Sequence, residues 1–218
     1  MTVYEIFKSF NTLAAPLLTS CEEPWDAIPR IKEFILSVIP TLDREVFEEI
    51  SPDVFVAKSA KIDKSAVILP PAIIGENTEI RPSAFIRGSV LIGNGCVIGN
   101  SSEVKNAILF DSVQIPHFNY VGDSILGYRS HLGAGAVTSN VKSDKSLVTV
   151  AAGREKIETG LKKFGAILGD SVEIGCNAVL CPGTVIGSNS TVYPLSRVRG
   201  FVPENSIFKS DKNIVPKA

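Results

Sequence analysis

Length, composition and charge limit what this protein can be. The sequence has 218 residues, 44% of them hydrophobic and 21% charged, which predicts one large domain, or one domain with an attached segment, and excludes a disordered chain. The formal net charge is −1, and no run of Lys or Arg is interleaved with aromatic residues. We therefore expect small-molecule partners, and neither nucleic acid nor a membrane.

The charge is unevenly divided along the chain. Residues 1–55 hold ten acidic and four basic residues, whereas residues 56–218 hold thirteen acidic and eighteen basic ones, so the larger part would suit an anionic ligand. The four cysteines, and the lack of a charged and then apolar leader after Met1, predict a reduced, cytoplasmic protein. No apolar stretch approaches the ~20 residues of a membrane span.

Residues 1–50 predict a short helical segment. Asp26 as N-cap, Pro29 in the first turn and Pro40 as a stop bound one amphipathic helix. Its apolar face comprises Ile28, Ile31, Ile35 and Val38. Residues 2–10 and 43–50 are candidates for two further helices.

From Val56 onward, every sixth residue is large and apolar. The row comprises Val56, Ile62, Ile68, Ile74, Ile80, Ile86, Ile92, Ile98, Val104 and Phe110. A second run has the same pattern and comprises Leu168, Ile174, Leu180, Ile186, Val192 and Val198. The position four residues later in each hexad is mostly small. A six-residue repeat is the signature of a parallel β-helix.

Period six fits short strands separated by tight turns, and neither an α-helix nor a simple alternating strand. Three hexads would close one triangular coil of about eighteen residues. The predicted fold class is therefore mainly β, with a β-helix domain over residues 51–202. Residues 1–50 would form a helical cap over its open end, where strand edges would otherwise be unpaired. An antiparallel sandwich is the alternative fold, and docking of a partner is the alternative role of the cap.

The repeat is interrupted once. Ile115, Val121, Leu126 and Leu132 continue the row with five-residue steps, and the periodicity then stops over residues 139–165. That stretch is rich in charged residues and predicts a polar loop that protrudes from one corner and folds over a ligand, since such long loops are usually functional. Residues 203–218 predict a short tail that packs on the other end or on a neighbouring molecule.

The two histidines lie where the register slips. His117 opens the motif His-x-x-Tyr-x-Gly-Asp, and residues 133–140 read Gly-Ala-Gly-x-x-Thr-x-Asn. With these motifs, residues 54–202 resemble the acetyltransferase half of the bifunctional enzymes that make UDP-N-acetylglucosamine. The resemblance implies a trimeric left-handed β-helix that N-acetylates glucosamine 1-phosphate with acetyl-CoA and without a metal.

The resemblance also implies roles for particular residues. His117 falls on the catalytic histidine, and Arg87 and Lys105 fall on basic residues of the sugar-phosphate site. The other candidate substrate-binding residues are Tyr120, His131 and Asn140. The candidate coenzyme-binding residues are Ala134, Lys163 and Cys176.

These roles also fit the chemistry of the side chains. A sugar amine that attacks a thioester must lose a proton, and histidine, with an ordinary pKa near ~6.5, is well matched to accept it at neutral pH. Arg87 and Lys105 are one coil apart in an eighteen-residue repeat, so they would stack on one face and form an anion site.

Two departures from the family leave the acceptor open. The family has an asparagine where this chain has His131, and Val141-Lys142-Ser143 replaces its Tyr-Asp-Gly after Asn140. No Gly-x-Gly-Thr-Arg nucleotide loop occurs, so we do not expect pyrophosphorylase activity.

We therefore predict a homotrimeric, acetyl-CoA-dependent N-acetyltransferase for an amino-sugar phosphate or a nucleotide-linked amino sugar. The alternatives are another acyl donor, a hydroxyl acceptor, or a non-catalytic β-helix that binds or scaffolds a sugar nucleotide. A zinc site of the type that hydrates carbon dioxide would need three histidines, and the sequence has only two. Cys176-x4-Cys181 is only a weak redox or metal-binding pattern.

Overall fold

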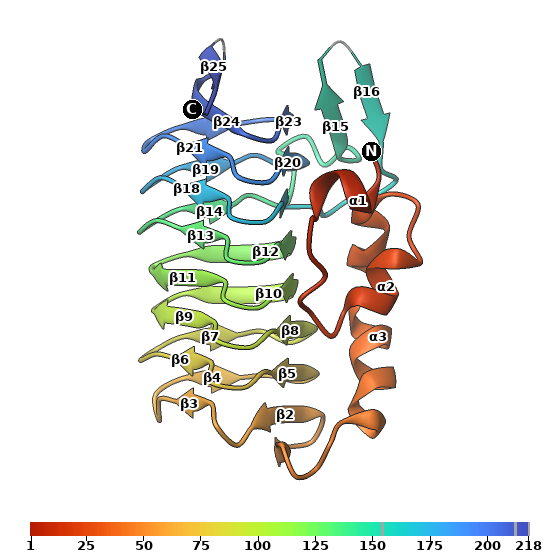
Figure 1. The fold of residues 1–218 in the computed structure, drawn as a ribbon, viewed down its shortest axis with the longest axis vertical. Coiled ribbons are helices and arrows are strands. Elements are labelled where there is room, and N and C mark those ends of the chain that lie inside the picture. Colours follow the sequence, from red (N-terminus) through yellow and green to blue (C-terminus); the bar gives the residue numbers. More distant parts are fainter. Residues whose placement is uncertain (154, 212, 218) are drawn as a thin grey trace.

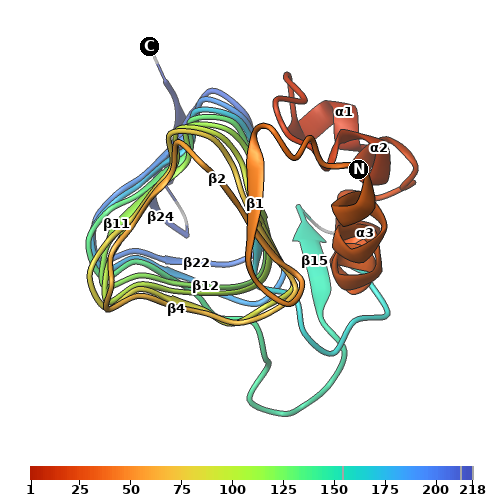
Figure 2. The same cartoon turned by 90° about the horizontal axis from the view of Figure 1, so that it is seen from below.

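The computed structural model describes residues 1–153, 155–211 and 213–217. Its body is a β-solenoid of about 9 turns, which confirms the predicted parallel β-helix with hexapeptide repeats (Figure 1). Viewed along its axis, the solenoid is triangular in cross-section (Figure 2). Two of its three faces belong to one 14-stranded sheet, and the third face is a 9-stranded sheet.

We name the three faces A, B and C. Face A comprises β4 (Val67–Ile68), β7 (Phe85–Ile86), the first halves of β10 (Glu103–Leu109) and β12 (Tyr120–Leu126), β14 (Val137–Thr138), β19 (Val179–Leu180) and β22 (Arg197–Val198). Face B comprises β2 (Val54–Ala57), β5 (Ala72–Ile74), β8 (Val90–Ile92), the second halves of β10 and β12, β17 (Ala166–Leu168), β20 (Thr184–Ile186) and β23 (Phe201–Val202). Face C comprises β3 (Lys61–Ile62), β6 (Glu79–Ile80), β9 (Val97–Asn100), β11 (Gln114–His117), β13 (His131–Leu132), β18 (Glu173–Ile174), β21 (Thr191–Val192) and β24 (Ser206–Ser210).

The register of the strands explains the shortened steps in the sequence. Ile74 pairs with Ile92, eighteen residues further on, but Ile92 pairs with Leu109 after only seventeen. The inward row remains continuous, because Ile92, Val104 and Val121 are all fully buried. A coil can therefore lose one residue at a corner without losing its place in the core.

Close stacking of the corners requires glycine at particular points. A Cβ atom at Gly99 would collide with the backbone carbonyl of Pro116 in the next coil. Only glycine therefore allows these two coils to approach at their normal spacing.

The N-terminal segment is less helical than predicted. It contains α1 (Val3–Ile6), α2 (Ala15–Thr19), a 3-10 helix (Pro24–Arg30), α3 (Ile31–Val38) and a second 3-10 turn (Ile39–Thr41). The prediction of Asp26 as N-cap is wrong, because Pro24 already starts the 3-10 helix and the Asp26 carboxylate instead accepts a hydrogen bond from the Glu23 N–H. Residues 2–10 form one helical turn only, which begins at a capping box between Thr2 and Glu5.

The helix predicted over residues 43–50 is also wrong. Residues Phe47–Ser51 form β1, which pairs antiparallel with β2 at the edge of the first coil. The left-handed backbone of Asp53 makes the tight turn between the two strands. This hairpin satisfies backbone groups that the first coil would otherwise leave unpaired.

The helices do not cap the end of the solenoid as predicted, and instead lie along its flank (Figures 1 and 2). The strands of face B carry apolar residues on their outer side as well as their inner side, and the outward-pointing middle residues Ile73, Leu91 and Ile167 are fully buried. An exposed sheet with this pattern would be unstable in water, so the segment is needed to cover face B. Contacts of α3 with β8 and β10 show where it packs.

Residues 139–165 contain a hairpin as well as a loop. Strands β15 (Thr149–Ala152) and β16 (Glu155–Glu158) pair antiparallel, and β15 contacts β20 and β23 of face B. Val148 and Val150 are fully buried. The loop that leads into β15 does protrude, as Figure 2 shows, but the buried valines return β15 to the solenoid, which the prediction of a polar loop over the whole stretch did not include.

The C-terminal residues continue the solenoid past residue 202. Strand β24 pairs parallel with β21 on face C, and β25 (Asn213–Pro216) folds back antiparallel onto β24. This hairpin covers the last coil, where the sequence predicted a packed tail. Within the described residues, no helix has the length and apolar character needed to span a membrane.

Candidate active site

Face A carries two ion pairs in neighbouring coils. Val104 pairs with Ile86, so Arg87 and Lys105 are neighbours on this face, as the repeat predicted. Arg87 Nη1 lies 2.6 Å from Glu103 Oε1, and Lys105 Nζ lies 3.5 Å from Asp123 Oδ2. The predicted anion site thus contains two carboxylates as well as two cations.

Asp123 connects the other polar residues of this face. Its carboxylate is almost completely buried and accepts hydrogen bonds from Asn106 Nδ2 at 2.8 Å and from Asn140 Nδ2. Asn140 Nδ2 also donates to Tyr120 Oη at 3.2 Å. Lys105, Tyr120 and Asn140 are therefore held in one network, and Asp123, the last residue of the His-x-x-Tyr-x-Gly-Asp motif, is its centre.

The Tyr120 hydroxyl remains a proton donor at neutral pH. Burial raises the pKa of this phenol, and the negative charges of Asp123 and Glu103 raise it further. Because the oxygen accepts from Asn140, its own proton is available for a ligand on face A.

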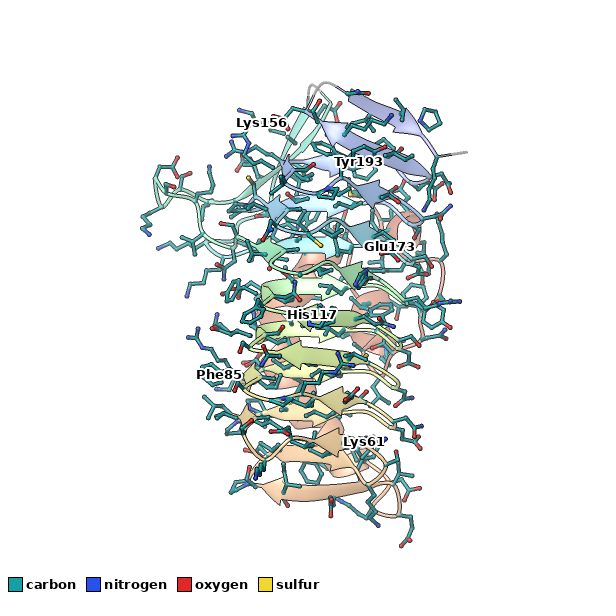
Figure 3. All side chains as sticks on the ribbon, turned by 90° about the vertical axis from the view of Figure 1, so that its left-hand side faces the viewer. Lys61, Phe85, His117, Lys156, Glu173 and Tyr193 are labelled. Atoms are coloured by element: carbon teal, nitrogen blue, oxygen red, sulfur yellow. The ribbon has the colours of Figure 1, made fainter. Side chains whose placement is uncertain are left out.

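His117 lies where β11 ends and the chain turns from face C to face A (Figure 3). Its side chain is exposed, and among the described residues the imidazole has no hydrogen-bond partner. The backbone is fixed, since the His117 N–H donates to Asn119 Oδ1 and the His117 carbonyl accepts from the Gly135 N–H, both at 3.0 Å. The imidazole is thus presented to solvent from a rigid corner.

Asn119 fixes that corner and had no predicted role. Its side chain is buried, and its Nδ2 donates to the carbonyls of Gly133 at 2.8 Å and Ala136 at 3.1 Å. The same side chain accepts from the His117 N–H. Asn119 therefore joins the corner that bears His117 to the next coil.

We expect Asn119→Ala to lower the free energy of unfolding by about 2–4 kcal/mol, because it leaves buried backbone groups without partners. Urea denaturation measures this loss. Asn100→Ala is the matched control at the same corner one coil away, where the asparagine makes a single side-chain bond to the Pro82 carbonyl, and it should cost less than about 1 kcal/mol. Equal losses in the two variants would contradict the role given to Asn119.

His117, Ala134 and Cys176 form a column at one corner. The Gly135 N–H donates to the His117 carbonyl and the Asn177 N–H donates to the Ala134 carbonyl, so the three residues occupy successive coils. The Cys176 side chain is exposed. Two of the three predicted coenzyme-binding residues therefore lie in line with His117.

Lys163 lies apart from that column. The N–H of its neighbour Phe164 donates to the Asn140 carbonyl at 3.0 Å, which places Lys163 beside the network of face A. The hairpin that precedes it packs on face B, so within one chain it does not cover Arg87 or Lys105.

His131 is not brought together with His117 or Tyr120 in this chain. It lies at the start of β13, whereas His117 lies at the end of the neighbouring strand β11. His131 Nδ1 is instead 2.8 Å from Glu173 Oε2. In the described part of the chain, no three His, Cys, Asp or Glu side chains are grouped to hold a metal ion.

Comparison with known proteins supports the interpretation of the six-residue repeat as a hexapeptide repeat. Residues 70–175 match the model of the GMPPB C-terminal domain, and residues 165–200 match the bacterial transferase hexapeptide model of six repeats. The bifunctional protein GlmU of Methanococcus vannielii is 36% identical over 117 residues, which are 53% of this chain and 28% of that protein. A bifunctional sugar-1-phosphate nucleotidylyltransferase/acetyltransferase of Sulfurisphaera tokodaii is 35% identical over 107 residues, 49% of this chain and 27% of that protein.

Among solved structures, PerB from Caulobacter crescentus, in complex with CoA and GDP-perosamine, is 19% identical. The alignment covers 73% of this chain and 57% of that one, with a TM-score of 0.43. The chain matches little more than a quarter of the length of its curated relatives.

Fold and matches together define a hexapeptide-repeat β-helix domain. This domain resembles the C-terminal acetyltransferase region of the bifunctional protein GlmU.

Proposed function

We propose that the protein is an acetyl-CoA-dependent N-acetyltransferase that acts on an amino-sugar phosphate or a nucleotide-linked amino sugar. The observation that carries the proposal is the exposed His117 at a rigid corner, in line with Ala134 and Cys176 and three residues before Tyr120, which belongs to the polar network of face A. The resemblance to an acetyltransferase region supports the same reaction class.

His117 is the general base in this proposal. The amine nitrogen of the acceptor attacks the thioester carbonyl, and the imidazole of His117 takes the proton that the amine loses. The tetrahedral intermediate then collapses, the carbon–sulfur bond breaks, and the leaving thiolate recovers a proton. The exposed imidazole has no partner in the described chain that would compete for this proton.

The cations of face A would bind the phosphate of the acceptor. Arginine has five N–H donors and lysine has three, so the ion pairs with Glu103 and Asp123 leave donors on both Arg87 and Lys105 free for phosphate oxygens. Tyr120 and Asn140 would contact the sugar, and Lys163 would approach phosphates from the neighbouring loop.

The proposal includes a homotrimer. Face B is covered by the chain itself, whereas the side chains of His117, Arg87 and Lys105 keep exposed parts that a second copy could enclose. Light scattering should therefore give about three times the chain mass of 23.3 kDa. If the protein is a monomer at micromolar concentration, the proposal of a site shared between copies is wrong.

The decisive measurement is thiol release from acetyl-CoA in the presence of a panel of amino sugars, amino-sugar phosphates and nucleotide-linked amino sugars. Release that depends on one of these acceptors supports the proposal. Binding of a sugar nucleotide without thiol release would favour the non-catalytic alternative.

Cysteine reactivity tests the coenzyme column. We expect Cys176 to be labelled rapidly by a disulfide reagent at pH 8, because its side chain is the most exposed to solvent of the four cysteines. Burial raises the pKa of the Cys96 thiol to about 12, so this thiol stays protonated and unreactive until the protein unfolds.

Coenzyme A should protect Cys176 from labelling if the coenzyme lies along this column. Cys21, which is partly exposed in the N-terminal segment, provides the internal control and should react at the same rate with and without coenzyme. Unchanged labelling of Cys176 at saturating coenzyme A would place the coenzyme elsewhere.

A further inference from the structure

The 3-10 helix of the N-terminal segment, Pro24–Arg30, lies against the corner between faces A and B. It contacts β12, the strand that carries both Tyr120 and Asp123. At this corner Asn106 and Asp123 occupy equivalent positions in successive coils, each with a left-handed backbone. The segment that covers face B therefore also reaches the residues that hold the polar network of face A.

Asn106 connects this helix to the network. Its side-chain amide has two hydrogens, and Nδ2 lies 2.8 Å from Asp123 Oδ1 and 3.4 Å from the carbonyl oxygen of Ile28. Asp123 is the carboxylate that holds Lys105 and Asn140. One side chain thus bridges the N-terminal segment and the centre of the network.

A second connection runs through Phe164, at the base of the long loop. The Phe164 N–H donates to the Asn140 carbonyl at 3.0 Å, and the Gly165 N–H donates to the Asp123 carbonyl at 2.8 Å. The ring of Phe164 packs on Trp25 of the same 3-10 helix, and both side chains are almost completely buried. Trp25 therefore holds in place a piece of chain whose backbone bonds reach both Asn140 and Asp123.

The two connections meet at one group of side chains. We propose that Trp25 and Asn106 are positioning residues for the acceptor site of face A, so that the N-terminal segment belongs to this site without touching the acceptor. Their role rests on the proposed function, in which Lys105, Tyr120 and Asn140 bind a phosphorylated amino sugar. Because Trp25 and Asn106 fix the places of hydrogen-bond donors, their effect is on acceptor affinity and not on proton transfer.

Hydrogen exchange tests the connection through Trp25 without any ligand. In Trp25→Leu, which removes the ring but keeps an apolar side chain, the amide hydrogens of Phe164 and Gly165 should exchange about tenfold faster, because the base of the loop opens more often. The Gly175 amide, which donates to the Val192 carbonyl on face C, should keep its rate. Trp25→Phe retains a ring and should restore most of the protection.

Phe7→Ala is the matched control for the exchange experiment. Phe7 is another buried aromatic residue of the N-terminal segment, and it stacks on Phe110 of the solenoid with 4.9 Å between ring centres. This variant should leave exchange of the Phe164 and Gly165 amides unchanged. Wild-type exchange rates in Trp25→Leu, acceleration that extends equally to the face C amide, or the same acceleration in Phe7→Ala would overturn the inference.

Kinetics with the acceptor identified by thiol release tests the effect on the site. Asn106→Gly keeps the left-handed backbone and should raise KM for a phosphorylated acceptor about tenfold, with kcat and KM for acetyl-CoA nearly unchanged. Trp25→Leu should change the same constant. A variant that is only less stable would instead lose kcat and keep its KM, because unfolded molecules do not take part. Ser89→Gly is the matched control, since Ser89 has φ of 53° at the same corner one coil earlier and its side chain makes no hydrogen bond within the described chain.

The two measurements separate this inference from the proposed function. If no acceptor gives thiol release, the proposed acetyl transfer is wrong, whereas exchange at Phe164 and Gly165 still decides whether Trp25 holds the network. If transfer is found but Trp25→Leu and Asn106→Gly leave KM for the acceptor at the wild-type value, the proposed function stands and the positioning role is wrong. A rise in KM for acetyl-CoA as large as that for the acceptor would also contradict the positioning role.

Discussion

Replacing His117 with alanine should lower kcat for acetyl transfer by about 10²–10⁴-fold, the usual contribution of a general base. The fold should be retained, because the imidazole is exposed and the corner is held through the backbone of His117 and the side chain of Asn119. Steady-state kinetics with the acceptor identified by thiol release measures the effect, and thermal unfolding checks that the variant is folded.

Two further variants distinguish the roles at this site. Arg87→Ala should mainly raise KM for a phosphorylated acceptor, since it removes binding of the phosphate and not proton transfer. His131→Asn, which restores the residue of the resembling family, should preserve or raise activity. If His117→Ala keeps full activity and His131→Asn loses it, the base is His131.

Phe164→Ala should lower the free energy of unfolding by about 3–5 kcal/mol, the usual cost of removing a buried aromatic ring. Phe164 is fully buried at the end of the long loop, and its ring centre lies 5.9 Å from that of Trp25 in the N-terminal segment. The variant therefore weakens the contact between the segment and the solenoid. Trp25 is the only tryptophan of the chain, so its fluorescence reports the change directly.

Phe118→Ala is the matched control for that experiment. Phe118 is 64% exposed and has a left-handed backbone, so its removal should change stability by less than about 0.5 kcal/mol and leave Trp25 emission unaltered. Urea unfolding of the three proteins side by side gives the comparison. A Phe164→Ala midpoint equal to that of the wild type would show that the segment is held by other contacts.

The core of the solenoid could be predicted from sequence because its signal is local and repeated. Val56, Ile74 and Ile92 fill the same position in successive coils, and a six-residue spacing has few other structural solutions. The placement of the helices could not be predicted in this way. It depends on a second row of apolar residues, Ile73, Leu91 and Ile167, which point outward from face B. In the sequence each of them stands next to an inward-facing residue, so the second row is not distinguished. Only when the strands are stacked do these residues form an apolar surface that must be covered.

The candidate site likewise contains residues that the sequence predicts and contacts that it does not. His117, Tyr120 and Asn140 stand in motifs, so they could be chosen without a structure. The pairings of Glu103, Asp123 and Glu173 could not be predicted, because each meets its cation or histidine through the register between coils. Asp123 gave a usable signal as part of a motif, whereas nothing in the sequence marks Glu173 as the partner of His131.

The N-terminal segment runs the length of face B, and its first residues contact the last coils. Lys8 forms an ion pair with Glu204 at 2.9 Å, and the Ile6 carbonyl accepts a hydrogen bond from Ser188 Oγ at 2.8 Å. Residues 6–8 can therefore dock only after the coils that hold Ser188 and Glu204 have formed. Most solenoids can gain or lose coils at an end with little effect on the others. Here the two ends of the chain are tied across the stack, so the coils should fold and unfold as one cooperative unit.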